Sequence, residues 1–179
     1  MVYTKLLKRQ VIELDIRLSG ICRESSVDGE GLRYVVFTQG CKHGCVGCHN
    51  PNTHDINGGY IESTDKIIDE FKMNKILRGI TISGGEPMLQ ADAVLDIAKN
   101  IKKLGKTVWV YTGYTWEQLI GMNNPTIVEL LNTIDVLVDG KFEIDKHSDN
   151  ILWRGSSNQR VIDSQRSICR NQIIQYFGR

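Results

Sequence analysis

Three of the five cysteines in this 179-residue chain lie within eight residues, at Cys41, Cys45 and Cys48. Gly40 precedes this stretch and Gly44 and Gly47 interrupt it, so a loop is expected here rather than a helix. On such a loop three thiolates can converge on one small object. An odd cysteine count with three members clustered favours metal binding in a reducing compartment over a disulfide framework. The sequence therefore predicts a metal centre at positions 41–48, with Cys22 and Cys169 as free thiols.

The segments around this loop alternate between strand-like and helix-like patterns. Apolar runs or period-two alternation predict strands at 12–18, 34–37, 79–82, 108–111 and 135–139. Helical spacing and capping signals predict helices at 64–71, with Thr64 as the cap, at 94–104, from 115 onward, at 127–131 and at 167–177. This alternation is typical of an α/β protein with a mainly parallel sheet. A complete eight-stranded barrel needs about 250 residues, so the length predicts a partial, laterally open (β/α) barrel in a single domain, 1–179.

Charge and hydropathy exclude several classes of protein. The formal net charge is +1, and no run of interleaved basic and aromatic residues suggests a nucleic-acid partner. No leader-like segment and no apolar run long enough to cross a bilayer is present, so we expect a cytoplasmic protein without a membrane partner. The arginine-rich end of the chain, from Arg154, is expected to be a solvated surface, with a docking face for an acidic partner as the alternative.

The number of cysteine ligands separates two kinds of metal centre. A structural zinc site usually needs four protein ligands, and His43 or His49 would have to complete it from a cramped position. An iron–sulfur cubane held by three thiolates instead leaves one iron open to a substrate or cofactor. S-adenosylmethionine, through its amino acid moiety, is the obvious chelating partner.

Two motifs resemble the radical S-adenosylmethionine superfamily. The spacing of Cys41, Cys45 and Cys48 fits its CxxxCxxC signature, and Ser83–Pro87 fits its GGE motif. This resemblance implies that the three cysteines hold a [4Fe-4S] cluster. It also implies that Gly84, Gly85 and Glu86 receive the amino end of S-adenosylmethionine and that Gly47, Cys48 and His49 lie near its adenine. The alternative for the GGE segment is a simple turn, in which Glu86 is a first-turn charge favoured by the helix dipole.

Further segments resemble the enzymes that activate glycyl radical enzymes, and among them the group acting on anaerobic ribonucleotide reductases. They are Asp28–Arg33, Val36–Cys41, Cys48–Pro51 and Trp153–Arg160, and the likeness covers about 16–163. It implies reductive cleavage of S-adenosylmethionine to a 5′-deoxyadenosyl radical, which removes hydrogen from a glycine of the reductase large subunit. It also implies a flavodoxin-like or ferredoxin-like electron donor. No further catalytic side chain is required.

The sequence departs from the pattern of these families at two positions. Three other functions are alternatives to the one that the resemblance implies. Gly47 stands where many superfamily members carry an aromatic residue against the adenine, and Glu30 stands where the activases often carry proline. Activation of pyruvate formate-lyase or a small-molecule reaction like that of the deazaguanine-forming enzymes are alternatives within the same chemistry. A zinc-stabilised binding module is the alternative from another class.

Several other polar and aromatic residues have more than one explanation. Thr112 and Asp139 follow strands that point at the site, but a surface turn is nearly as good an explanation for each. For Trp153 and Arg160, contact with cofactor or partner and simple loop packing are equally supported. The remaining predictions are core positions for Trp109 and Tyr111 and solvent or loop positions for His43, His54 and His147.

Overall fold

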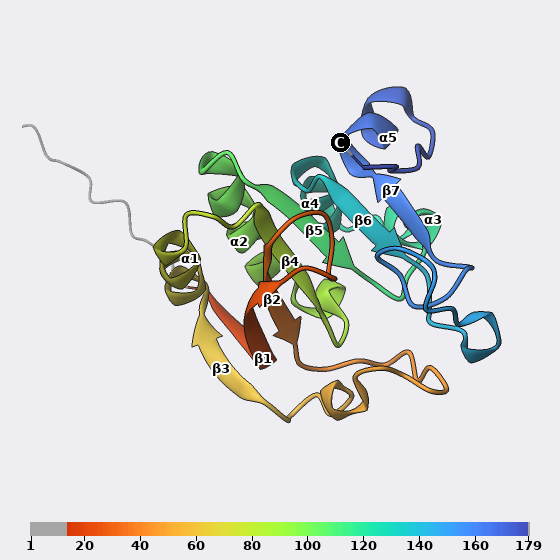
Figure 1. Ribbon diagram of the computed structural model, residues 1–179, viewed down its shortest axis with the longest axis horizontal. Helices are drawn as coiled ribbons and strands as arrows, with labels where there is room; N and C mark the ends of the chain where they lie inside the picture. Colours follow the sequence, from red (N-terminus) through yellow and green to blue (C-terminus); the bar gives the residue numbers. More distant parts are fainter. Residues whose placement is uncertain (1–13, 179) are drawn as a thin grey trace, which may run out of the picture.

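The computed structural model describes residues 14–178 and is built around one open sheet (Figure 1). Its strand order is β3 (Tyr60–Ser63), β1 (Asp15–Ser25), β2 (Arg33–Thr38), β4 (Gly79–Gly84), β5 (Thr107–Tyr111), β6 (Val136–Asp139) and β7 (Arg160–Asp163). The four central strands β2, β4, β5 and β6 are parallel, whereas β1, β3 and β7 are antiparallel to their neighbours. The predicted α/β class is therefore confirmed. Because β3 and β7 are the two ends of the order, the sheet does not close.

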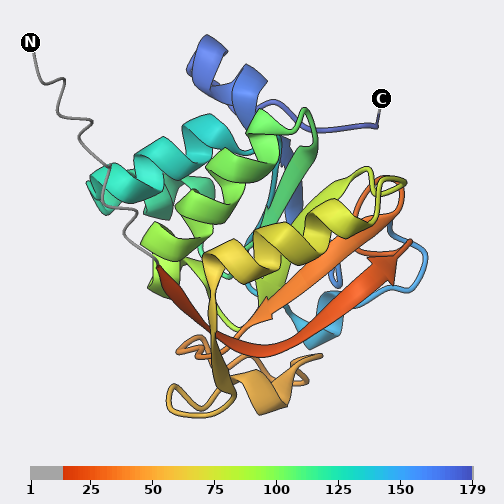
Figure 2. The ribbon, with the colours of Figure 1, turned by 90° about the vertical axis from the view of Figure 1, so that its left-hand side faces the viewer.

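The helices α1, α2 and α4 lie side by side over one face of the sheet (Figure 2). The helical bounds are α1 (Thr64–Met73), α2 (Ala91–Lys103), α3 (Trp116–Gly121), α4 (Pro125–Thr133) and α5 (Ser164–Arg170). Helix α2 forms because Val94, Ile97, Ala98 and Ile101 share one buried stripe at helical spacing. Leu104, the last residue of the predicted helix, is its C-cap and is 42% exposed, so the buried stripe ends at Ile101.

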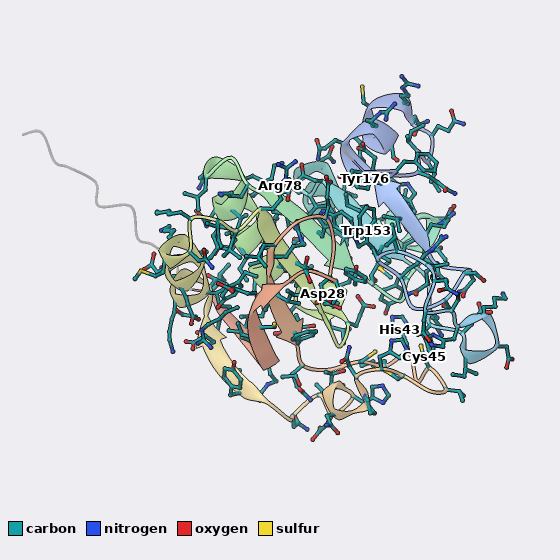
Figure 3. The ribbon with its side chains drawn as sticks, in the orientation of Figure 1. Asp28, His43, Cys45, Arg78, Trp153 and Tyr176 are labelled. Carbon is teal, nitrogen blue, oxygen red and sulfur yellow. The ribbon has the colours of Figure 1, made fainter. Side chains whose placement is uncertain are left out.

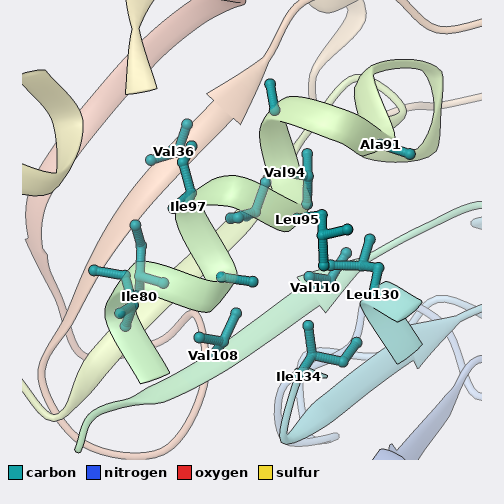
Figure 4. Close-up of a cluster of buried hydrophobic side chains, with 14 of the residues drawn as sticks. Val36, Ile80, Ala91, Val94, Leu95, Ile97, Val108, Val110, Leu130 and Ile134 are labelled. Carbon is teal, nitrogen blue, oxygen red and sulfur yellow. The ribbon is translucent and has the colours of Figure 1, made fainter. Parts of the chain in front are cut away.

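Alternate residues of each central strand pack on opposite faces of the sheet. On the helical face, Val108 and Val110 of β5 meet Ile97 and Leu130 in the main core (Figure 4). Trp109 lies between them in sequence and points to the other face, where it joins a second core. The members of that second core are Trp109, Val136, Val138, Val161 and Tyr176. Burial on both faces explains why the central strands are nearly continuous apolar runs.

The second face also contains a buried cation. Arg33 of β2 is fully buried, and its guanidinium carbon lies 5.3 Å from the centre of a Trp109 ring. It donates hydrogen bonds to the hydroxyls of Thr81 and Thr107 and to the carbonyls of Glu30 and Ile80. Burial lowers the pKa of Arg33 to about 10. The residue therefore remains charged near neutral pH, held by neutral acceptors and an aromatic ring.

Several predicted boundaries are wrong for physical reasons. Ser63, rather than Thr64, caps α1, because its hydroxyl accepts from the Lys66 amide. Strand β3 was not predicted. The final helix begins at Ser164 and ends at Arg170, and Asn171 then adopts a left-handed conformation. The rest of the predicted helix returns as an extended segment, with Gln175 paired to Ile162 of β7.

Parts of two predictions lie outside the described residues. The first predicted strand starts at Ile12, and the interpretation of the N-terminal segment falls wholly on residues before Leu14. From Ile16 onward the predicted alternation is confirmed, since Ile16 and Leu18 are fully buried. Within 14–178, no helix has both the length and the apolar character needed to cross a membrane.

Candidate functional site

The cysteine loop follows the carboxyl end of β2 and forms one wall of a cavity of about 640 Å3. Positive φ angles at Gly44 and Gly47, +62° and +71°, let the chain reverse between successive cysteines. The cavity wall includes all three clustered cysteines together with Gly84 and Gly85. The structure therefore brings the two predicted motifs to one place, at the carboxyl edge of the parallel strands. Figure 3 shows His43 and Cys45 together on this loop.

The cysteine loop offers thiol donors, which are the ligands that iron–sulfur clusters use. All five cysteines are free, and the three in the loop are partly exposed to the cavity. Across residues 14–178, no group of three His, Cys, Asp or Glu side chains is placed to hold one ion. Burial raises the pKa of the Cys41 thiol, a cost that coordination by iron would offset because a bound metal deprotonates its thiol ligand.

Backbone hydrogen bonds join the GGE segment to the cysteine loop. The Gly85 amide donates to the Thr38 carbonyl and the Glu86 amide donates to the Gly40 carbonyl, each at 2.8 Å. At Gly84, where φ is +96°, an added Cβ would lie 2.7 Å from the Phe37 Cα and from the Thr38 amide nitrogen. Glycine is therefore required by close backbone approach, and the position of one loop fixes the position of the other.

The Glu86 side chain is buried, at 1% exposure, and its carboxylate accepts four hydrogen bonds. One oxygen accepts from the Met88 amide at 3.0 Å and from the Thr112 hydroxyl at 2.8 Å. The other accepts from the Gly113 amide at 2.9 Å and from His43 Nε2 at 2.6 Å. Because a carboxylate can only accept, His43 must carry its hydrogen on Nε2 in this contact. The carboxylate thus connects the end of β5, the turn into α2 and the cysteine loop.

This network corrects the prediction for His43 and sharpens that for Thr112. The side chain of His43 is only 9% exposed, and its ring packs edge-on against Tyr114 at 4.6 Å. It is therefore a packed residue of the site, not a solvent residue. Thr112 is buried against Glu86. His54 and His147 also line the cavity.

A segment of which only the last part, from Trp153, was singled out in the sequence packs against the cysteine loop. We call residues 140–159, between β6 and β7, the covering loop. Its Phe142 ring lies 4.4 Å from the ring of His49, and its His147 ring lies 5.5 Å from His49. Ile144 packs over Gly47, where an added Cβ would lie 2.9 Å from the Ile144 Cδ1. Sequence spacing did not mark these residues, because the contacts join positions about 100 residues apart.

The late motif at 153–160 mainly holds this covering loop in place. Gln159 Oε1 accepts from the amides of Gly155 and Ser156, at 2.9 and 3.1 Å, and its Nε2 donates to the Gly140 carbonyl at 2.9 Å. Trp153 packs on Trp109 at 5.1 Å and also lines the cavity (Figure 3).

Arg160 and Asp139 form an ion pair at the base of the loop. Arg160 pairs with Asp139 at 2.5 Å and with Glu117 at 2.8 Å. Hydrogen bonds to these two carboxylates raise the pKa of Arg160, and the same contact lowers the pKa of Glu117 to about 2. Asp139 also accepts from the Trp116 amide. Arg160 is thus held by carboxylates of β6 and α3, and its contact with a cofactor or partner stays a prediction.

Comparison with known proteins agrees with this site. Residues 27–162 match the family described as the 4Fe-4S single cluster domain, so sheet and cysteine loop together define an iron–sulfur protein of that class. The chain is 41% identical over 144 residues to the anaerobic ribonucleoside-triphosphate reductase-activating protein of Salmonella typhi and 40% identical to that of Escherichia coli strain K12, covering 75% of this chain and 90% of each relative. The chain belongs to the family of anaerobic ribonucleoside-triphosphate reductase-activating proteins.

Two more distant likenesses complete the comparison. The protein of the same name from Enterobacteria phage T4 is 32% identical over 141 residues, covering 75% of this chain and 86% of the relative. The crystal structure of QueE from Escherichia coli aligns with a TM-score of 0.44 and 18% identity, over 58% of this chain and 54% of that one. The second likeness is too distant to support any assignment.

Proposed function

We propose that this chain activates an anaerobic ribonucleoside-triphosphate reductase by generating a glycyl radical in it. The observation that carries the proposal is the junction of two loops at one cavity wall, one with three thiols and one with the GGE segment. Family membership supports the same activity, because the relatives are named as activating proteins of that reductase. The partner is then the reductase subunit that carries the glycine.

In this proposal Cys41, Cys45 and Cys48 hold a [4Fe-4S] cluster. Gly84, Gly85 and Glu86 receive the amino end of S-adenosylmethionine, and Gly47, Cys48 and His49 lie near its adenosine. When both are bound and an external donor has reduced the cluster by one electron, S-adenosylmethionine and the cluster would supply a 5′-deoxyadenosyl radical for removal of a hydrogen atom from the partner's glycine.

The residues of the chain bind and orient these groups. Backbone at Gly84 and Gly85 is exposed to the cavity without side chains in the way. The four acceptor positions of Glu86 are already filled by two backbone amides and by the side chains of His43 and Thr112, so one of these donors would have to release the carboxylate before an ammonium group could pair with it. No proton-transferring pair is needed.

Four further properties of the fold, the location and the electron donor extend the proposal. The open sheet, with helices on one face and the cavity at its carboxyl edge, supports a partial (β/α) barrel that admits a macromolecule from the side. The chain would act as one domain with its core at about 16–163. We further propose a cytoplasmic protein that takes electrons from a flavodoxin-like or ferredoxin-like donor.

Iron and sulfide analysis of anaerobically prepared protein, followed by assay of reductive S-adenosylmethionine cleavage, tests the cofactors. We expect about four irons and four sulfides per chain and cleavage by the wild type. Cys45→Ala should abolish cleavage while far-ultraviolet circular dichroism stays unchanged, and Cys169→Ala, at an exposed thiol on α5, should cleave normally. A colourless preparation with zinc alone, or cleavage retained by Cys45→Ala, would contradict the proposal.

A further inference from the structure

The cavity has an aromatic wall that comes from the covering loop rather than from the cysteine loop. Phe142 is half-buried and lines the cavity beside Cys48 and His49. The rings of Phe142, His147 and His49 pack against one another with centroids 4.4 to 5.7 Å apart. Two rings of the covering loop therefore pack against His49 of the cysteine loop, and all three rings line the cavity.

Position 47 cannot supply such a surface in this chain. Gly47 has φ of +71°, and any side chain there would meet Ile144 at 2.9 Å. An aromatic residue at 47 would thus be strained by the positive φ and would also require the Ile144 side chain to move. The space beside the third cysteine is filled by the apolar side chain of Ile144, and the aromatic side chain next to it is Phe142.

The covering loop is held firmly enough to present this wall. Gln159 accepts from the amides of Gly155 and Ser156, and His147 Nδ1 lies 2.8 Å from the Gly155 carbonyl. Gly155 leaves room for the rings, because a Cβ there would lie 2.9 Å from His49 and 3.0 Å from Phe142. The late motif therefore helps to hold the aromatic side chains of the covering loop beside the cysteine loop.

We propose that Phe142 provides the apolar aromatic surface for the adenine of S-adenosylmethionine, in place of the residue before the third cysteine. The inference rests on the proposed function, since it assumes that S-adenosylmethionine occupies the cavity. A purine offers a flat π-face, and stacking on an aromatic side chain is independent of the base's hydrogen-bonding edges. Phe142 is then a residue for binding and orienting the nucleoside, and it takes no part in bond breaking.

The test compares two ligands that differ only at the nucleoside. Equilibrium binding to cluster-loaded protein would be measured for S-adenosylmethionine and for S-methylmethionine, which keeps the sulfonium and the amino acid but lacks adenosine. Phe142→Ala and Phe142→Leu should each weaken S-adenosylmethionine binding by about tenfold or more, while S-methylmethionine affinity stays the same. Phe142→Tyr, which restores an aromatic face, should bind like the wild type.

The control is Phe177→Ala, a change of the same size at a side chain that is 87% exposed and absent from the cavity wall. It should bind both ligands like the wild type. Equal affinity for S-adenosylmethionine in the wild type and Phe142→Ala would overturn the inference and leave the proposed function standing. Equal loss of both ligands would also overturn it, because Phe142 would then only support the cluster site. Wild-type protein that carries a cluster but binds no S-adenosylmethionine would overturn the proposed function as well.

Discussion

Glu86 connects three parts of the site through a single carboxylate. Replacing it with glutamine turns one acceptor oxygen into a donor that faces other donors, the Gly113 amide and His43 or the Met88 amide and Thr112. We expect Glu86→Gln to lower the free energy of unfolding by about 2 kcal/mol. Urea denaturation measures this change.

Glu129→Gln is the matched control, because Glu129 pairs with Lys99 at the surface and is 55% exposed. Its effect should stay within about 0.5 kcal/mol. Similar losses in the two variants would mean that the buried network around Glu86 contributes little to stability.

Gly84 allows the close backbone approach between β4 and the end of β2. Gly84→Ala would place a Cβ 2.7 Å from two backbone atoms at a φ of +96°, so we expect a loss of more than about 2 kcal/mol. Gly121→Ala, in α3 with nothing within 4 Å, should instead be neutral or stabilise by about 0.5 kcal/mol. Thermal unfolding of both variants provides the comparison, and an equally stable Gly84→Ala protein would contradict the tight junction.

Glu117 gives a pH-dependent contribution to stability. Its folded pKa is about 2, below the value of about 4.3 in unfolded chains, because Arg160 donates hydrogen bonds to it. The contribution is therefore complete above about pH 4.3 and is lost as the pH falls toward 2. Since the side chain is 60% exposed, it amounts to less than about 1 kcal/mol.

Urea unfolding of the wild type and Glu117→Gln at several pH values checks this expectation. The wild type should be the more stable protein at pH 7, and the difference should vanish near pH 2. A difference that stays constant across that range would show that Glu117 acts through packing rather than through its charge.

At the scale of elements, Gln159 makes three of the hydrogen bonds that hold the covering loop together. Gln159→Leu removes the acceptor for the Gly155 and Ser156 amides and the donor to Gly140, so the loop should open more often. We expect several-fold faster tryptic cleavage after Lys146 than in the wild type. Mass spectrometry of timed digests identifies the cut.

Gln165→Leu is the matched control for this digest. Gln165 also bonds to backbone, at the carbonyls of Asn132 and Ile134, but it lies on α5 away from the covering loop. Cleavage after Lys146 should keep the wild-type rate in this variant. Equal acceleration in both variants would indicate general destabilisation rather than release of one loop.

The elements also show what sequence patterns can and cannot predict. Strands β2, β4, β5 and β6 were identifiable because burial on both faces leaves apolar runs. Strand β3 was missed because Tyr60 and Ile61 are exposed at the sheet edge and carry no burial pattern. The tail was mistaken for a helix because its apolar spacing is set by contact with β7, a pairing that local periodicity does not encode.

The candidate site also has parts that sequence patterns predict and parts that they do not. Its two loops carry local motifs, so Cys41 and Gly84 could be placed from the sequence. The contacts that complete the site are long-range, as in the pairs His43 with Glu86 and Phe142 with His49. The sequence spacing of one residue in such a pair does not indicate the other, because only the fold brings the two together.

At the scale of the whole molecule, the protein is an open α/β sheet whose parallel strands place two loops and an aromatic wall around one cavity, and the buried carboxylate of Glu86 joins the two loops. The covering loop forms one side of this cavity and connects β6 to β7, the last strand of the sheet. Radical formation in a partner requires that the partner's glycine reach this cavity. Hydrogen transfer in this proposal takes place between two chains, so its test needs a measurement on both.

That measurement is electron paramagnetic resonance of an anaerobic mixture of the cluster-loaded protein, reductant, S-adenosylmethionine and the reductase. We expect a glycyl doublet with the wild type and with Cys169→Ala, and none with Cys45→Ala. A doublet with Cys45→Ala would contradict the ligand assignment. Absence of a doublet with the wild type, together with a doublet when pyruvate formate-lyase replaces the reductase, would contradict the proposed partner.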